Sequence, residues 1–109
     1  MNKKIVLAEL PEGIPVVYFA NLTTQIIFSW FKNFAHLVVA NDPRSFQDRE
    51  YLAVTVWKDI GTETYKIIQV IFDNKNQIIY DARVIKADSV DSVIKQTHSD
   101  GKIEIALWQ

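Results

Sequence analysis

The spacing of apolar residues changes several times along the chain, and each change marks a predicted element. Residues 51–58 alternate between apolar and other side chains, which fits the period of two of a strand. Residues 63–73 are apolar on both faces, so we predict a strand in the middle of a sheet. Asn and Asp side chains at residues 73–76 are typical of a tight turn, which predicts a hairpin into a further strand over residues 77–86.

The same alternation assigns the faces of two of these strands. In the first of them, Leu52, Val54 and Val56 are expected on one face, and Tyr51, Ala53, Thr55 and Trp57 on the other. In the strand over residues 77–86, Ile78, Tyr80, Ala82 and Val84 are expected on one face, and Ile79, Asp81, Arg83 and Ile85 on the other.

Between residues 21 and 40 the apolar residues recur every three or four positions, which predicts a helix. Asn21, Thr23 and Thr24 are the alternatives for its N-cap. The helix is expected to end before Asn41, because Pro43 disfavours helical backbone at the residue before it.

Shorter elements complete the prediction. Residues 4–9, 14–19 and 102–108 are expected to be strands. Asp88 is expected to cap a short second helix that ends near His98, with Asp91 in its first turn and Gly101 just beyond its end.

Together these elements predict a single α+β domain over residues 1–109. Its sheet is expected to be curved, mostly antiparallel and packed against one long helix in the N-terminal half, with a short second helix before the last strand. The composition agrees, because 49% hydrophobic residues provide enough apolar surface for one core.

Charge and composition exclude several classes of function. A net charge of -1 provides no long-range attraction to nucleic acid. The chain contains no cysteine, so disulfides, thiolate nucleophiles and cysteine metal sites are excluded. Residues 14–40 are apolar enough to suggest a membrane span, but polar residues such as Asn33 recur through them. The first apolar run resembles the start of a secretory signal peptide, but Glu9 and Pro11 cut it short. We therefore expect a cytoplasmic protein.

Catalytic motifs are absent from the sequence. The three glycines stand alone, so no phosphate-binding loop is formed, and no serine has the glycine neighbours of a nucleophile elbow. No cofactor is expected. Asp88, Asp91, His98 and Asp100 come nearest to a metal-ligand set, but capping explains the first two, so we expect no metal site. His98 is expected to be solvated at a helix end.

One alternative is a small enzyme or ligand-binding protein. His36 and Asp81 would serve as its acid and base, because imidazole titrates near neutrality and a carboxylate orients it. The walls of such a pocket would be aromatic, with Trp30, Phe34, Tyr65 and Tyr80.

The main hypothesis is a non-enzymatic protein-binding module. Tyr51, Trp57 and Trp108 share the less aliphatic strand faces, and aromatic residues and arginine often anchor protein interfaces. A charged segment precedes them in the chain. The residues expected to contact a partner are Asp42, Arg44, Asp48, Arg49, Glu50, Tyr51 and Trp57.

The most concrete form of this hypothesis is a bacterial immunity or antitoxin protein, which would neutralise a toxin by occluding its active site. The partner would then be another protein, with no nucleic acid or membrane involved. A homodimer formed through residues 102–108 is a third alternative, because an unpaired strand is able to pair with its own copy.

Overall fold

The computed structural model describes residues 13–41, 51–58 and 64–108, and for residues 34–41 it describes the backbone only. The elements in chain order are β1 (Val16–Leu22), α2 (Thr24–Asn41), β2 (Tyr51–Lys58), β3 (Tyr65–Asp73), β4 (Ile78–Val90), α3 (Ser92–Thr97) and β5 (Ile105–Trp108). The strand predicted over residues 4–9 lies outside the described residues.

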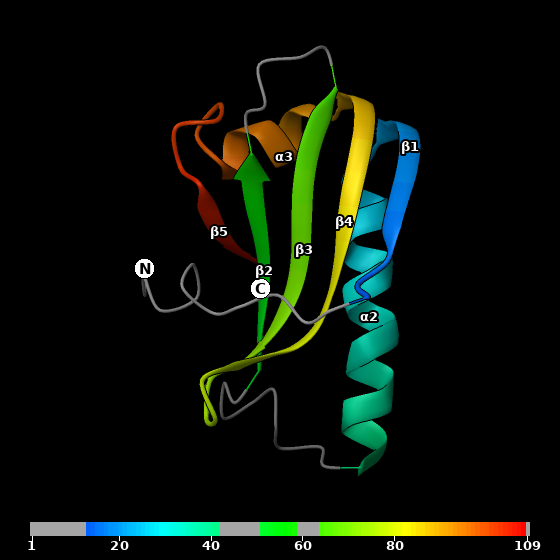
Figure 1. The fold of residues 1–109 in the computed structure, drawn as a ribbon, viewed down its shortest axis with the longest axis vertical. Coiled ribbons are helices and arrows are strands. Elements are labelled where there is room, and N and C mark those ends of the chain that lie inside the picture. Colours follow the sequence, from blue (N-terminus) through cyan, green and yellow to red (C-terminus); the bar gives the residue numbers. More distant parts are fainter. Residues whose placement is uncertain (1–12, 42–50, 59–63, 109) are drawn as a thin grey trace.

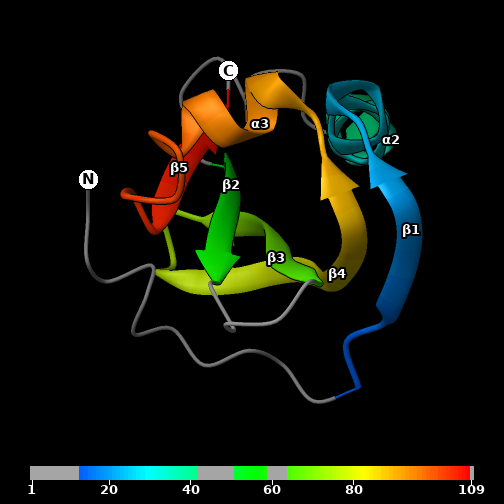
Figure 2. The same ribbon diagram turned by 90° about the horizontal axis from the view of Figure 1, so that it is seen from above.

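Within the described residues, the strands form one five-stranded sheet in the order β1-β4-β3-β2-β5 (Figure 1). All neighbours pair antiparallel except β1 and β4, which are parallel. Seen from above, the sheet forms an arc, and α2 and α3 both lie on its concave side (Figure 2). The predicted α+β class and mostly antiparallel sheet are therefore confirmed.

Both faces of the sheet are apolar. The concave face contributes Ile67, Ile71 and Ile85 to a core cluster with Ile27 and Phe31 of α2. The opposite face has its own cluster, which comprises Val54, Val56, Ile68, Val70, Phe72, Ala82, Val84 and Ile105. The predicted faces of β2 agree with these clusters, and β3 is central and buried on both sides as expected.

A β-bulge changes the predicted faces of β4. Ile71 pairs with Asp81 but Phe72 pairs with Ile79, so Tyr80 is an extra residue in the ladder. Ile79 consequently packs with the cluster that contains Ala82, which lies on the face opposite to the one predicted for Ile79. The prediction is wrong before the bulge, because one added residue reverses the direction of every side chain that precedes it.

Helix α2 begins where a threonine provides the cap. The Thr23 hydroxyl accepts a hydrogen bond from the Ile26 amide at 3.3 Å, which selects Thr23 from the three predicted alternatives. Ile27 and Phe31 pack against the sheet as expected for the predicted helix, but its predicted length is not confirmed, because side chains of α2 are described only over residues 24–33.

Asp91 connects the starts of the two helices. Its Oδ1 accepts hydrogen bonds from the amides of Val93 at 2.8 Å and Ile94 at 3.2 Å, and so caps α3. Its Oδ2 accepts from the amide of Thr24 at 2.8 Å and from the Thr24 hydroxyl at 2.7 Å. Burial by itself would raise the pKa of Asp91, but these hydrogen bonds together hold that pKa below its ordinary value.

The prediction that Asp88 caps this helix is therefore wrong. Strand β4 continues to Val90, because its last residues pair with β1 as far as the match of Leu22 with Val90. Asp88 lies within the strand and accepts a hydrogen bond from the hydroxyl of Tyr18. The N-cap of α3 is instead Asp91, the first carboxylate after the parallel pairing of β1 and β4 ends.

Substitution of Asp91 by alanine is expected to lower the free energy of unfolding by about 2 kcal/mol, the upper end for a lost cap, because two helices lose an acceptor. Urea unfolding at pH 7 measures this. The exposed Asp88→Ala variant is the control and should change stability by less than about 0.5 kcal/mol. Equal unfolding midpoints for the two variants would contradict the assignment.

Acid should remove the contribution of Asp91. The folded protein holds the pKa of this carboxyl below its unfolded value. The unfolded chain therefore binds the proton first as pH falls, and stability is lost below about pH 4. The loss of stability between pH 5 and pH 3, measured as the fall of the urea unfolding midpoint, should be larger for Asp88→Ala than for Asp91→Ala.

Candidate functional site

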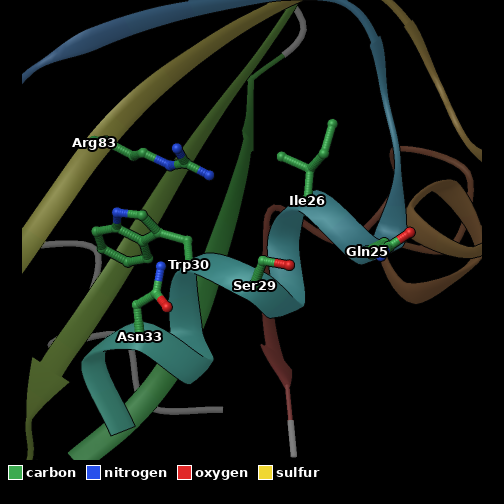
Figure 3. A pocket seen from close by; sticks show the side chains of 6 residues that line it. All are labelled: Gln25, Ile26, Ser29, Trp30, Asn33 and Arg83. Atoms are coloured by element: carbon green, nitrogen blue, oxygen red, sulfur yellow. The ribbon is translucent and has the colours of Figure 1, made fainter. Parts of the chain in front are cut away.

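An open groove of about 350 Å³ lies between α2 and β4 (Figure 3). Its wall on the helix side is formed by one face of α2, and Arg83 reaches it from the sheet. The lining residues are Gln25, Ile26, Ser29, Trp30, Asn33 and Arg83. This volume is at the lower end of the range for small-ligand sites, so the groove suits a single side chain or a small group.

Arg83 is held in place by a buried amide and two aromatic rings. Its Nε donates a hydrogen bond to Oε1 of Gln69 at 2.8 Å, and Nε2 of Gln69 donates to the Ile27 carbonyl of α2 at 2.8 Å. The guanidinium carbon lies 5.3 Å from the centre of the Trp30 ring and 5.7 Å from that of Phe19. These contacts position the cation before any ligand arrives.

The outer end of the Arg83 guanidinium is available. Among the residues that the structure describes, the ion pair present is that of Lys58 with Glu104, at 2.7 Å, and Arg83 has no carboxylate partner. Arg83 lines the groove, and in Figure 3 its guanidinium is directed toward α2. Desolvation lowers the pKa of Arg83, yet a guanidinium stays charged at neutral pH.

Arg83 ends a polar row that crosses the concave face of the sheet. Thr55 of β2 pairs in register with Gln69 of β3, and Gln69 pairs with Arg83 of β4. Thr55 and Gln69 are fully buried. Because unpaired polar groups are costly in a core, each member of the row must have a partner, and each does.

The other end of this row is a buried histidine. His98 is 0% exposed, its Nε2 lies 2.7 Å from the Thr55 hydroxyl and its Nδ1 lies 3.0 Å from the Ile103 carbonyl. The Ile103 carbonyl only accepts, so the neutral imidazole carries its hydrogen on Nδ1 and its Nε2 accepts from the Thr55 hydroxyl, which itself accepts from the Trp108 indole at 2.6 Å. Burial lowers the pKa of His98, although the hydrogen bond with Ile103 opposes this.

The prediction of a solvated His98 is therefore wrong. The helix-end position suggested exposure, but α3 packs against the sheet and its last turn brings the imidazole into the core next to Trp57, with ring centres 5.6 Å apart. Both ring nitrogens are occupied by hydrogen bonds. This histidine consequently stabilises the fold and is not accessible to a substrate.

The structure locates only part of the predicted partner-binding set. Asp42, Arg44, Asp48, Arg49 and Glu50 lie outside the described residues. Tyr51 is half-buried and packs edge-on against Tyr80, with ring centres 5.4 Å apart. Trp57 is only 9% exposed, like Trp108, so both indoles belong to the concave core and present little surface to a partner.

The residues of the alternative enzyme hypothesis are only partly described. Of His36 and Phe34 the structure describes the backbone in α2, and Asp81 is exposed, with its Oδ1 accepting from the Ala82 amide at 2.9 Å. Of the proposed aromatic walls whose side chains are described, Trp30 lines the groove, Tyr80 packs on Tyr51, and Tyr65 packs on Trp57. The pairing of His36 with Asp81 stays a prediction.

Within the described residues, no group of three or more His, Cys, Asp or Glu is placed to hold a metal ion. Among the same residues, no helix has the length and apolar character needed to cross a membrane.

Of the residues that line the groove, sequence reasoning named only Trp30 as a pocket wall. Arg83 appeared only as one member of a strand face, and Gln69 was counted within an apolar strand. The available signal was Gln69 itself, a lone amide between Ile68 and Val70, since a polar residue in a central strand needs a buried partner.

Comparisons of this chain with protein families, with curated proteins and with solved structures found no match.

Stability should fall as pH drops below about 6.5, because the unfolded chain binds a proton at His98 that the folded chain resists. The expected slope is at most about 1.4 kcal/mol per pH unit. Urea unfolding between pH 7.5 and 5.5, followed by tryptophan fluorescence, measures it. His98→Gln should reduce the dependence of the unfolding free energy on pH. His36→Gln is the control and should keep the share of that dependence that is due to His98. An unchanged slope in His98→Gln would show that another group titrates.

Proposed function

We propose that this protein is a non-enzymatic binding module whose groove between α2 and β4 contacts another protein. The observation that carries the proposal is Arg83, a cation fixed by Gln69 at an open groove and without an acidic partner among the described residues. A charge held in this way gains most from a ligand that supplies the missing anion.

The composition of the groove supports a protein partner. Arginine and tryptophan are the residue types most often found as energetic anchors of interfaces, and Arg83 and Trp30 lie together here. Gln25, Ser29 and Asn33 add neutral polar groups around them, which is typical of an interface rim. The arrangement suits one protruding acidic side chain of a partner.

The most concrete form of the proposal is a bacterial immunity or antitoxin protein in the cytoplasm, which blocks a toxin by covering its active site. Active-site clefts of enzymes that act on nucleic acid or peptides often carry carboxylates, which a fixed guanidinium would complement. Tyr51 and the charged residues between 42 and 50 stay predicted partner contacts.

A binding experiment with a defined partner tests the proposal. The full chain is mixed with the purified product of a neighbouring gene, and affinity is measured by calorimetry. Arg83→Gln is expected to weaken binding by about 30-fold or more, because interface anchors have effects of this size. Lys86→Gln removes the same charge from an exposed position of β4 and is expected to change affinity less than about threefold.

Two results would count against the proposal. If the chain stays monomeric and binds no neighbouring gene product, the binding function fails. If a complex forms but Arg83→Gln and Lys86→Gln weaken it equally, the groove is not the contact surface. Thermal unfolding of both variants accompanies the measurement, so that loss of fold is not mistaken for loss of contact.

A further inference from the structure

The hydrogen bonds of Arg83 leave one geometry for a ligand. A guanidinium presents two forks, one through Nε and one through its two terminal nitrogens. The Nε of Arg83 is occupied by Gln69 at 2.8 Å, so the side fork is closed. Figure 3 shows the guanidinium directed toward α2, so the end fork is the one left for a ligand in the groove, and its two parallel N–H groups match the two oxygens of a carboxylate.

The charge of the groove favours a monoanion. Arg83 is the cation among the lining residues, and the others are neutral. Lys86 follows on the same strand but is exposed, and alternation directs it to the other face of the sheet. A phosphate group carries close to two negative charges at neutral pH and is usually met by more than one cation or by a helix N-terminus.

The wall beside the guanidinium is apolar. Ile26 and Trp30 project from α2 on the same side as Arg83, as Figure 3 shows. Methylene groups that lead to a carboxylate would pack on these side chains while the carboxylate meets the end fork. Glutamate and aspartate have this combination of a short apolar stem and a planar anion.

We propose that the groove is a carboxylate-binding site in which the end fork of Arg83 holds the glutamate or aspartate side chain of a partner protein in a bidentate pair. Gln69 acts as a positioning residue, because it occupies Nε and ties the guanidinium to the Ile27 carbonyl of α2. The inference rests on the proposed binding function and adds the chemical group that is recognised.

Capped tripeptides test this site in the full chain. Acetyl-Ala-Glu-Ala-amide is titrated into ¹⁵N-labelled protein, and the Nε–H signal of Arg83 and the indole signal of Trp30 are followed by NMR. Both signals should shift saturably. The matched glutamine peptide is expected to bind at least about tenfold more weakly than the glutamate peptide, since it lacks the charge-assisted pair.

Three variants separate geometry from charge. Arg83→Gln should abolish the saturable shift of Trp30, and Lys86→Gln should leave it unchanged. Arg83→Lys keeps the charge but loses the fork, so affinity is expected to fall about fivefold or more. Equal binding of the glutamate peptide by Arg83→Lys and the unaltered protein would overturn the bidentate pair.

The probes also distinguish the source of the anion. Inorganic phosphate that binds more tightly than the glutamate peptide would overturn the carboxylate assignment. If acetate binds as tightly as the glutamate peptide, the apolar wall contributes nothing to binding. That result would overturn the proposal that the ligand is a side chain of a partner protein.

This inference and the proposed function fail separately. If the glutamate peptide binds through Arg83 but no partner complex depends on Arg83, the carboxylate site stands and the proposed function is wrong. If a partner complex depends on Arg83 while glutamate and glutamine peptides bind alike, the binding function stands and the carboxylate inference is wrong.

Discussion

The carboxylate of Asp91 holds the first turns of both helices, and the layout of the concave side depends on it. One oxygen caps α3, and the other accepts two hydrogen bonds from Thr24 at the start of α2. The connection joins segments 67 residues apart in the chain. Because Trp30 belongs to the same helix, the point at which α2 starts decides what stands opposite Arg83.

A second constraint comes from the polar row across the core. Thr55 and Gln69 lie where neighbouring strands supply mainly apolar side chains, and burying such groups is costly unless every hydrogen bond is formed. His98 and Trp108 satisfy Thr55, while Arg83 and the Ile27 carbonyl satisfy Gln69. The row therefore links the buried histidine at one end to the groove at the other, and it leaves Arg83 with little freedom to move.

The elements that sequence predicted best are those with local causes. Asp73 forms the expected turn because its carboxylate accepts from the amides of Lys75 and Asn76, both at 3.0 Å, and strands β3 and β4 follow as a hairpin. Strand β2 has the expected faces, since alternation needs no knowledge of the partner strand. Errors appear where a distant segment intervenes: β1 extends β4 past Asp88.

By itself, the sequence determined the class of the fold, the order of most elements, the tight turn and the two faces of β2, because periodicity and capping act over a few residues. Only the tertiary structure decided that β1 lies parallel to β4, that His98 is buried, and that Arg83 meets Gln69 and Trp30 at a groove. Those features follow from the register between strands and from the placement of α2. Register is a property of pairs of segments, and no single segment carries it.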